Sequence, residues 1–242
     1  MTLNANTTVR QFALEMPNAT RIFETLKIDY CCGGNVPLDE ACNAAGVAVD
    51  SVMRLLEESA KKGSQNGART DFQKAPLSEL TSYIVDKHHA FTRQEMDRLR
   101  ALLDKVCSAH GQNHPELLTV QALFRELCMD LTPHMFKEEQ MLFPYIERME
   151  EAAKNGHEIS PPPFGTVRNP VRMMMMEHDT AGDLLRKLRE TSSDYTVPKD
   201  GCISYQTLYQ AMEAFEQDLH QHIHLENNVL FPRAVEMEDA KG

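Results

Sequence analysis

DLTPHMFKEEQMLFP (residues 130–144) and DLHQHIHLENNVLFP (residues 218–232) are two copies of one pattern, and this pattern decides the fold. Seven residue types recur in the same register, 88 residues apart. Residues four apart lie on one face of an α-helix, so His134 projects beside Glu138, and His222 beside Glu226. Such an internal repeat predicts two structural units of the same design.

Helical patterns extend outward from both copies. They cover about residues 77–110, 115–155, 171–190 and 203–235. Helices of similar length joined by short connections favour an antiparallel bundle. The sequence therefore predicts an all-α protein in which residues 77–242 form a four-helix bundle made of two helical hairpins.

The chain before the bundle has a different character. Residues 1–62 show short helical patterns separated by turn signals, among them Cys31-Cys32-Gly33-Gly34. They predict a small helical domain with a vicinal cysteine pair, near the lower size limit for independent stability. Residues 63–76 are polar and contain glycine, which predicts a linker.

Composition restricts the function classes. A net charge of −11 without a basic run argues against nucleic acid as a partner. A membrane span needs about 18 or more consecutive apolar residues, and the sequence contains no such stretch. The first residues lack the pattern of a signal peptide, so we expect a cytoplasmic protein. The six cysteines lack disulfide-framework spacing, which fits a reducing compartment.

The chemistry of the repeat points to metal binding. Burying His and Glu on a helix stripe is costly unless charges are compensated, and a metal ion compensates them directly. The two remaining helices carry His88 and His178 at corresponding places. The six predicted metal ligands are His88, His134, Glu138, His178, His222 and Glu226.

Four imidazoles and two carboxylates suit two ions, each bound by two His and sharing both carboxylates. This donor set without thiolate fits non-haem iron, and also Mn or Zn. A single His-x-x-x-Glu pair is usually a solvated contact; two copies in register favour a metal site. Asp130, Asp218 and Glu177 are expected to orient the ligands.

Several histidines leave alternatives open. His89 adjoins His88, while His220 and His224 flank His222. At roughly 100° of rotation per residue, neighbours one or two positions away point off the stripe, which disfavours them. His110, near the end of its helix, is a reserve candidate. Pro133 precedes His134 inside a helix and predicts a kink or local widening over residues 129–134.

The order H…HxxxE…H…HxxxE resembles the hemerythrin-like di-iron fold. Combined with DYCCGG (residues 29–34), it resembles the repair-of-iron-centres family of bacterial di-iron proteins. The phrases KEEQMLFP (137–144), EHDTAG (177–182) and LENNVLFPRA (225–234) carry the resemblance, which covers nearly the whole chain. The family's metal ligands fall on the same six residues.

The resemblance implies two oxo- or hydroxo-bridged iron ions and a role in repairing iron–sulfur clusters after nitrosative or oxidative stress. It implies reaction with NO, reduction of NO to N2O as a candidate enzymatic activity, and iron donation to damaged iron–sulfur proteins. Cys31 and Cys32 would then be redox or iron-delivery thiols, and the alternative is a quiet structural turn.

A different class of function stays open. Other hemerythrin-like domains carry or sense O2 or NO, and this chain would then be a binding module. The small size of the first domain also favours docking, either on the bundle or on a second subunit, and we expect a homodimer formed through this domain.

Overall fold

The structure, a computed structural model, describes residues 3–240 except residues 17, 63–70 and 161. These described residues are predominantly α-helical and contain no β-strand, which confirms the predicted fold class. Two compact units are present: Met1–Pro76 with His220–Pro232, and Leu77–Leu219 with Arg233–Gly242. The first unit thus includes a short segment of the last long helix. Most of the predicted linker, residues 63–70, lies outside the described residues.

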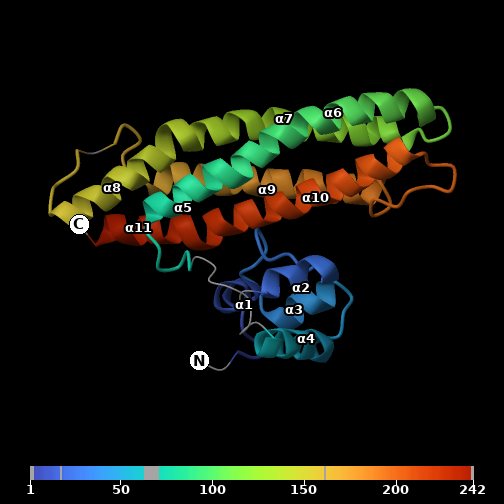
Figure 1. The fold of residues 1–242 in the computed structure, drawn as a ribbon. Helices are drawn as coiled ribbons and strands as arrows, with labels where there is room; N and C mark the ends of the chain where they lie inside the picture. The colour runs from blue at the N-terminus through green and yellow to red at the C-terminus, as the bar shows by residue number, and fades with distance from the viewer. Residues whose placement is uncertain (1–2, 17, 63–70, 161, 241–242) are drawn as a thin grey trace. The chain divides into compact units, whose positions relative to one another are not determined.

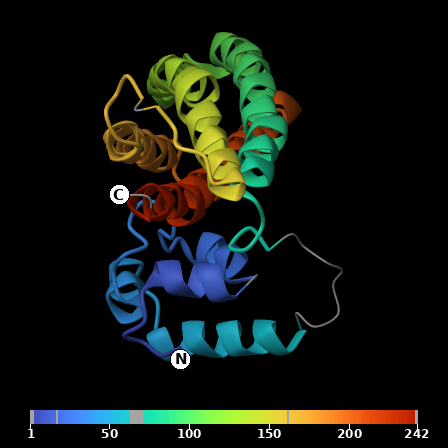
Figure 2. The same cartoon turned by 90° about the vertical axis from the view of Figure 1, so that its left-hand side faces the viewer.

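Four short helices form the N-terminal part of the first unit (Figures 1 and 2). They are α1 (Val9–Glu15), α2 (Ala19–Leu26), α3 (Leu38–Ala44) and α4 (Val49–Lys62). The hydroxyl of Thr8 accepts a hydrogen bond from the backbone N–H of Gln11 and so begins α1. Buried aromatic and aliphatic side chains such as Phe12, Phe23 and Leu56 make a small core.

Long helices form the bundle, and Figure 1 shows them side by side. The first runs through α5 (Leu77–Tyr83), η2 (Ile84–His89) and α6 (Ala90–His110). The second runs through α7 (Glu116–Lys137), η3 (Glu138–Leu142) and α8 (Phe143–Asn155). The third is α9 (Arg168–Thr191), and the last runs through α10 (Ile203–Leu225), η4 (Glu226–Leu230) and α11 (Phe231–Asp239). The predicted spans agree with these to within a few residues.

The segments η2, η3 and η4 are π-helical turns, in which backbone hydrogen bonds join residues five apart. Such wide turns are often found at functional sites. The sequence predicts a distortion over residues 129–134 because of Pro133. The chain is α-helical through Pro133, and the wide turn begins at Glu138 instead.

Two buried or half-buried glutamates fix where helices begin. Glu150 accepts hydrogen bonds from the backbone N–H of Leu77 at 2.7 Å and from that of Ser78 at 3.2 Å. Glu238, 88 positions later, accepts one from the N–H of Val167 at 2.9 Å. Carboxylates stabilise helix N-termini by satisfying N–H groups and complementing the helix dipole. The internal repeat therefore includes a capping device that sets the register of both hairpins.

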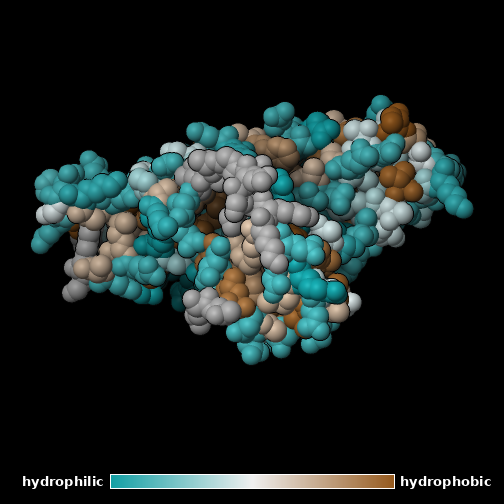
Figure 3. Space-filling view, turned by 60° about the horizontal axis from the view of Figure 1, so that its bottom comes forward, coloured by the Kyte–Doolittle hydropathy of each residue, from teal (hydrophilic) through white to brown (hydrophobic). Residues whose placement is uncertain are grey.

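The surface in Figure 3 is mainly hydrophilic, with hydrophobic side chains in small patches. Leucine, isoleucine, phenylalanine and tyrosine side chains fill the bundle interior, for example Leu99, Leu127 and Phe215. Among the described helices, none combines the length and apolar character needed to cross a bilayer.

Candidate metal centre

Buried His and Glu side chains form two groups of four, and within each group the potential ligand atoms all lie within 4.8 Å of one another. The first group is His89, Glu138, His222 and Glu226. The second group is His134, Glu138, His178 and Glu226. Both groups contain the same two carboxylates, so the arrangement can hold two ions with the carboxylates shared between them.

The nitrogen and oxygen atoms converge closely. His134 Nε2 lies 3.0 Å from His178 Nε2 and 3.3 Å from Glu138 Oε1. His222 Nε2 lies 3.0 Å from Glu226 Oε1. Both carboxylates are fully buried. Buried anionic groups need compensation, and imidazole with carboxylate is the donor set of non-haem iron, so the residues present fit that metal.

Carboxylates outside the two groups orient the imidazoles. His134 Nδ1 lies 2.8 Å from Glu177 Oε2, and His89 Nδ1 lies 2.6 Å from Glu139 Oε1. The hydrogen bond from His134 lowers the pKa of Glu177, and Lys137 adds to this effect. With Nδ1–H donating to a carboxylate, Nε2 of each ring faces the centre as a ligand atom. Sequence reasoning anticipated Glu177 and missed Glu139.

The structure brings His89 to the centre, whereas the sequence prediction named His88. His89 Nε2 lies 3.4 Å from Glu138 Oε2. His88 is also buried, and its Nδ1 lies 3.0 Å from Asp218 Oδ2. Asp218 thus binds a histidine as expected, while Asp130 is exposed.

The wide turn η2 explains the difference between the two histidines. Regular α-helical rotation would turn His89 away from the stripe, but residues 84–89 form the wide turn η2, in which the rotation per residue is smaller. His89 is twelve residues after the capped Leu77, whereas His178 is eleven residues after the capped Val167. The helix α9 is α-helical throughout, so one extra residue in the first hairpin is absorbed by the wide turn.

Cys31 and Cys32 do not belong to either group. Their sulfur atoms are 3.8 Å apart, and both backbone N–H groups donate to Asp29 Oδ1 at 3.0 Å. The hydrogen bond with Cys32, burial and the Asp29 carboxylate raise the pKa of Cys31 well above its usual value. This raised pKa disfavours the thiolate form of Cys31, and the role predicted for the pair stays a prediction.

The remaining histidine candidates also lie outside the groups. His220 Nδ1 lies 3.0 Å from Glu24 Oε1. His224 is buried, which lowers its pKa to about 4. His110 lies with its ring 5.5 Å from that of Tyr205, near the start of α10.

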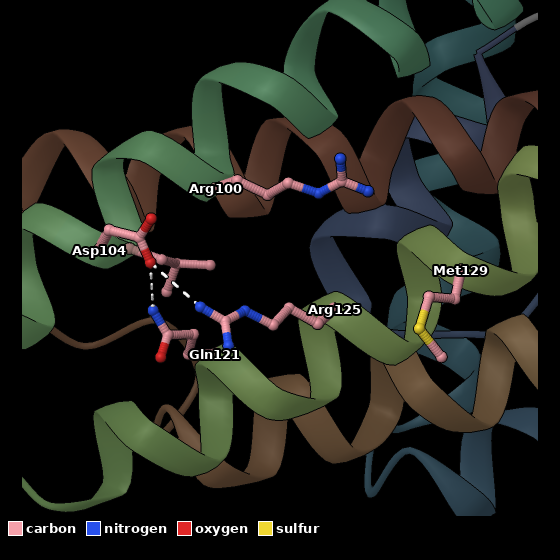
Figure 4. Close-up of a pocket in the computed structure, with 6 residues that line it drawn as sticks. Arg100, Asp104, Gln121, Arg125 and Met129 are labelled. Atoms are coloured by element: carbon pink, nitrogen blue, oxygen red, sulfur yellow. Dashed lines mark hydrogen bonds and ion pairs between the residues drawn. The ribbon is translucent and has the colours of Figure 1, made fainter.

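A cavity of about 280 Å³ opens between α6 and α7 (Figure 4). Asp104 on its wall accepts hydrogen bonds from Gln121 at 2.7 Å and from Arg125 at 3.2 Å. Arg100, Leu103 and Met129 complete its lining. None of these residues belongs to the His and Glu groups, so the cavity is separate from the metal centre.

Two family models match the chain. The model of the hemerythrin HHE cation binding domain matches residues 80–234. A domain of unknown function, DUF542, matches residues 5–60.

Curated relatives match this chain along most of their length. The "Probable iron-sulfur cluster repair protein" of Haemophilus influenzae is 32% identical over 225 residues, covering 93% of this chain and 95% of the relative. The "Iron-sulfur cluster repair protein YtfE" of Yersinia pseudotuberculosis is 32% identical over 233 residues, covering 96% and 98%. The chain belongs to the iron–sulfur cluster repair family. This confirms the resemblance inferred from the sequence.

Both groups of His and Glu side chains lie in the part of this repair-family chain that matches the hemerythrin model. The cluster fits a di-iron site, and together with the domain match it indicates iron binding. The vicinal cysteines lie inside the second match.

Proposed function

We propose that this chain binds two iron ions and acts in the cytoplasm to repair iron–sulfur clusters damaged by nitrosative and oxidative stress. One observation carries the proposal: two groups of ligands share Glu138 and Glu226 in a chain related to iron–sulfur cluster repair proteins. An oxo or hydroxo bridge between the irons is part of the proposal.

The sequence prediction and the geometry of the two groups both support five of the proposed ligands: His134, Glu138, His178, His222 and Glu226. The sixth is one of the adjacent pair His88 and His89. The sequence favours His88, whereas the position of His89 Nε2 beside Glu138 supports His89.

The residues of the chain prepare the centre for chemistry. Glu139 and Glu177 hold the imidazoles of His89 and His134 with Nε2 inward. Burial of both shared carboxylates keeps bulk water away and strengthens electrostatic interactions. Iron bound there would supply coordination positions for NO and the two electrons that, with two protons, convert two NO to N2O and water.

The first experiment measures the metal content and visible absorption of the purified protein, beside Glu138→Leu and Glu226→Leu. We expect about two irons per chain and oxo-bridge absorption in the wild type. Both variants should lose them because each removes a shared carboxylate. The exposed Glu151→Leu is the matched control and should keep its iron. Zinc, a single metal, or iron retained in both variants would contradict the proposal.

Two assays then separate the branches of the proposed role. N2O from the reduced protein and NO would support NO reduction. Iron transfer to an apo iron–sulfur protein would support donation to damaged iron–sulfur proteins. A protein that does neither would rule out both branches.

A carrier or sensor of O2 or NO is the alternative function, and the names of the relatives support repair over it. A stable, reversible O2 adduct of the reduced protein would support this candidate over repair. The proposed homodimer is tested by sedimentation equilibrium, where a monomer at all concentrations would refute it.

A further inference from the structure

The two copies of the repeat differ along one face. Three positions spaced four residues apart hold Thr132, Phe136 and Gln140 in the first copy, and all three are exposed. The equivalent positions in the second copy hold His220, His224 and Asn228. Here His224 and Asn228 are buried, each 7% exposed, whereas Phe136 is 62% exposed. This face is therefore covered in the second copy and open in the first.

The loop with the vicinal cysteines covers it, within the same compact unit. The amide nitrogen of Asn228 donates to the backbone carbonyl of Tyr30 at 3.0 Å and to His224 Nδ1 at 2.9 Å. Asn227 donates to the carbonyl of Cys31 at 3.3 Å. The His224 ring packs edge-on against the Tyr30 ring, with centroids 5.4 Å apart.

These contacts begin one residue after a shared carboxylate. Glu226, Asn227 and Asn228 are consecutive residues of the wide turn η4. The three residues follow one another on the backbone of a single helical turn, so a displacement of Glu226 is passed directly to its two neighbours. A shift of Glu226 therefore moves the two amides that hold the carbonyls of Tyr30 and Cys31.

We propose that Asn227 and Asn228 form a clasp that ties the Cys31–Cys32 loop to Glu226, so that metal at the centre controls how readily the two thiols react. The asparagines are positioning residues that act through the loop backbone. Metal on Glu226 orders η4, closes the clasp and protects the thiols. Loss of metal disorders η4, opens the clasp and exposes the thiols. The proposal rests on metal binding by Glu226, as in the proposed function.

The test measures alkylation rates of Cys31 and Cys32 by iodoacetamide, resolved by mass spectrometry, in iron-loaded and chelator-treated full-length protein. In the wild type we expect alkylation to be at least about fivefold slower with iron, because local opening controls access. In Asn227→Ala/Asn228→Ala both thiols should react quickly in either state. Gln140→Ala, which changes the equivalent residue of the first copy, is the matched control and should behave as wild type.

Cys42, buried in the core of the N-terminal helices, reports on general unfolding in the same samples. An unchanged Cys42 rate in the double variant shows that only the loop is released. If Cys42 also reacts faster there, Asn228→Asp decides, since it keeps the size of the side chain and removes the donor. A metal effect that survives in the deciding variant would overturn the clasp.

Metal analysis of each sample separates this proposal from the proposed function. Thiols that ignore iron in a protein with two irons would refute the clasp and leave the repair role standing. A protein that binds another metal would refute the di-iron proposal, and the clasp would be judged with that metal by the same rates.

Discussion

Cysteine reactivity shows how a single residue depends on its surroundings. The sequence directs attention to Cys31 and Cys32, yet the structure raises the pKa of Cys31. Cys202 is exposed and lies directly before α10. Hydrogen bonds from the backbone N–H of Tyr205 and from His110 lower its pKa to about 7. Neither influence is visible in the sequence, because one needs the helix start and the other a distant residue.

We therefore expect Cys202 to be alkylated faster at neutral pH than the buried Cys128, whose pKa burial raises to about 11. The rate at Cys202 should rise with pH and reach half its maximum near pH 7, as the thiolate forms. His110→Ala should move this midpoint to higher pH. Residue-resolved mass spectrometry over pH 5 to 10 measures it, and a midpoint unchanged by the substitution would contradict the assigned role of His110.

The choice between His88 and His89 is the second prediction at this scale. We expect His89→Ala to lose about half or more of the bound iron and to change the visible spectrum, because it removes a ligand nitrogen. His88→Ala should keep more iron, since His88 bonds Asp218. The reverse result would restore the sequence-based choice of His88.

At the scale of elements, periodicity and turn signals predicted where the helices lie, because an apolar stripe repeats visibly along the chain. The wide turns η2, η3 and η4 escaped prediction. The backbone geometry of a wide turn is unfavourable by itself and is offset by contacts between distant residues, such as those of Glu138. No local sequence pattern shows such contacts, so it does not show the turn either. The capping residues Glu150 and Glu238 also escaped prediction, because each caps the N-terminus of a helix that is distant in the sequence.

Glu150 offers a prediction about stability. Burial alone would raise its pKa, but hydrogen bonds from Ser78 and from the N–H of Leu77 lower it. A lowered pKa means that the carboxylate stabilises the fold above its unfolded pKa, and that this contribution is lost as pH falls through the folded pKa.

Glu150→Gln should therefore lower the free energy of unfolding by about 1 kcal/mol at pH 7. The difference from wild type should shrink below about pH 4. Urea denaturation of chelator-treated protein measures it, with the exposed Glu151→Gln as control. An equal loss at both pH values would show that charge is not involved.

For the whole molecule, the candidate centre was predictable because of the internal repeat. A single His-x-x-x-Glu pair carries little information, whereas two copies in register define both hairpins and four of the six proposed ligands, and His178 lies upstream of the second copy. What stayed hidden was the covering of one copy by the Cys31–Cys32 loop. That contact joins Tyr30 to Asn228, far apart in the chain, and nothing local signals it.

Ligands that come from each long helix imply that metal binding stabilises the whole bundle. Iron at 100 times its dissociation constant would add about 2.7 kcal/mol. We expect the unfolding temperature of the iron-loaded protein to exceed that of the chelator-treated protein by several degrees, measured by circular dichroism. Glu226→Leu should abolish most of this difference, and equal unfolding temperatures in the wild type would exclude a stabilising metal.

The wide turn η2 bears on how related sequences should be compared. On the helix that contains η2, His89 lies twelve residues after the capped Leu77. On α9, His178 lies eleven residues after the capped Val167. An alignment that forbids gaps inside helices would pair His178 with His88, whereas a one-residue gap pairs it with His89. A histidine that drifts by one position between homologues can thus keep its place in space, and a short gap upstream of it marks a wide turn.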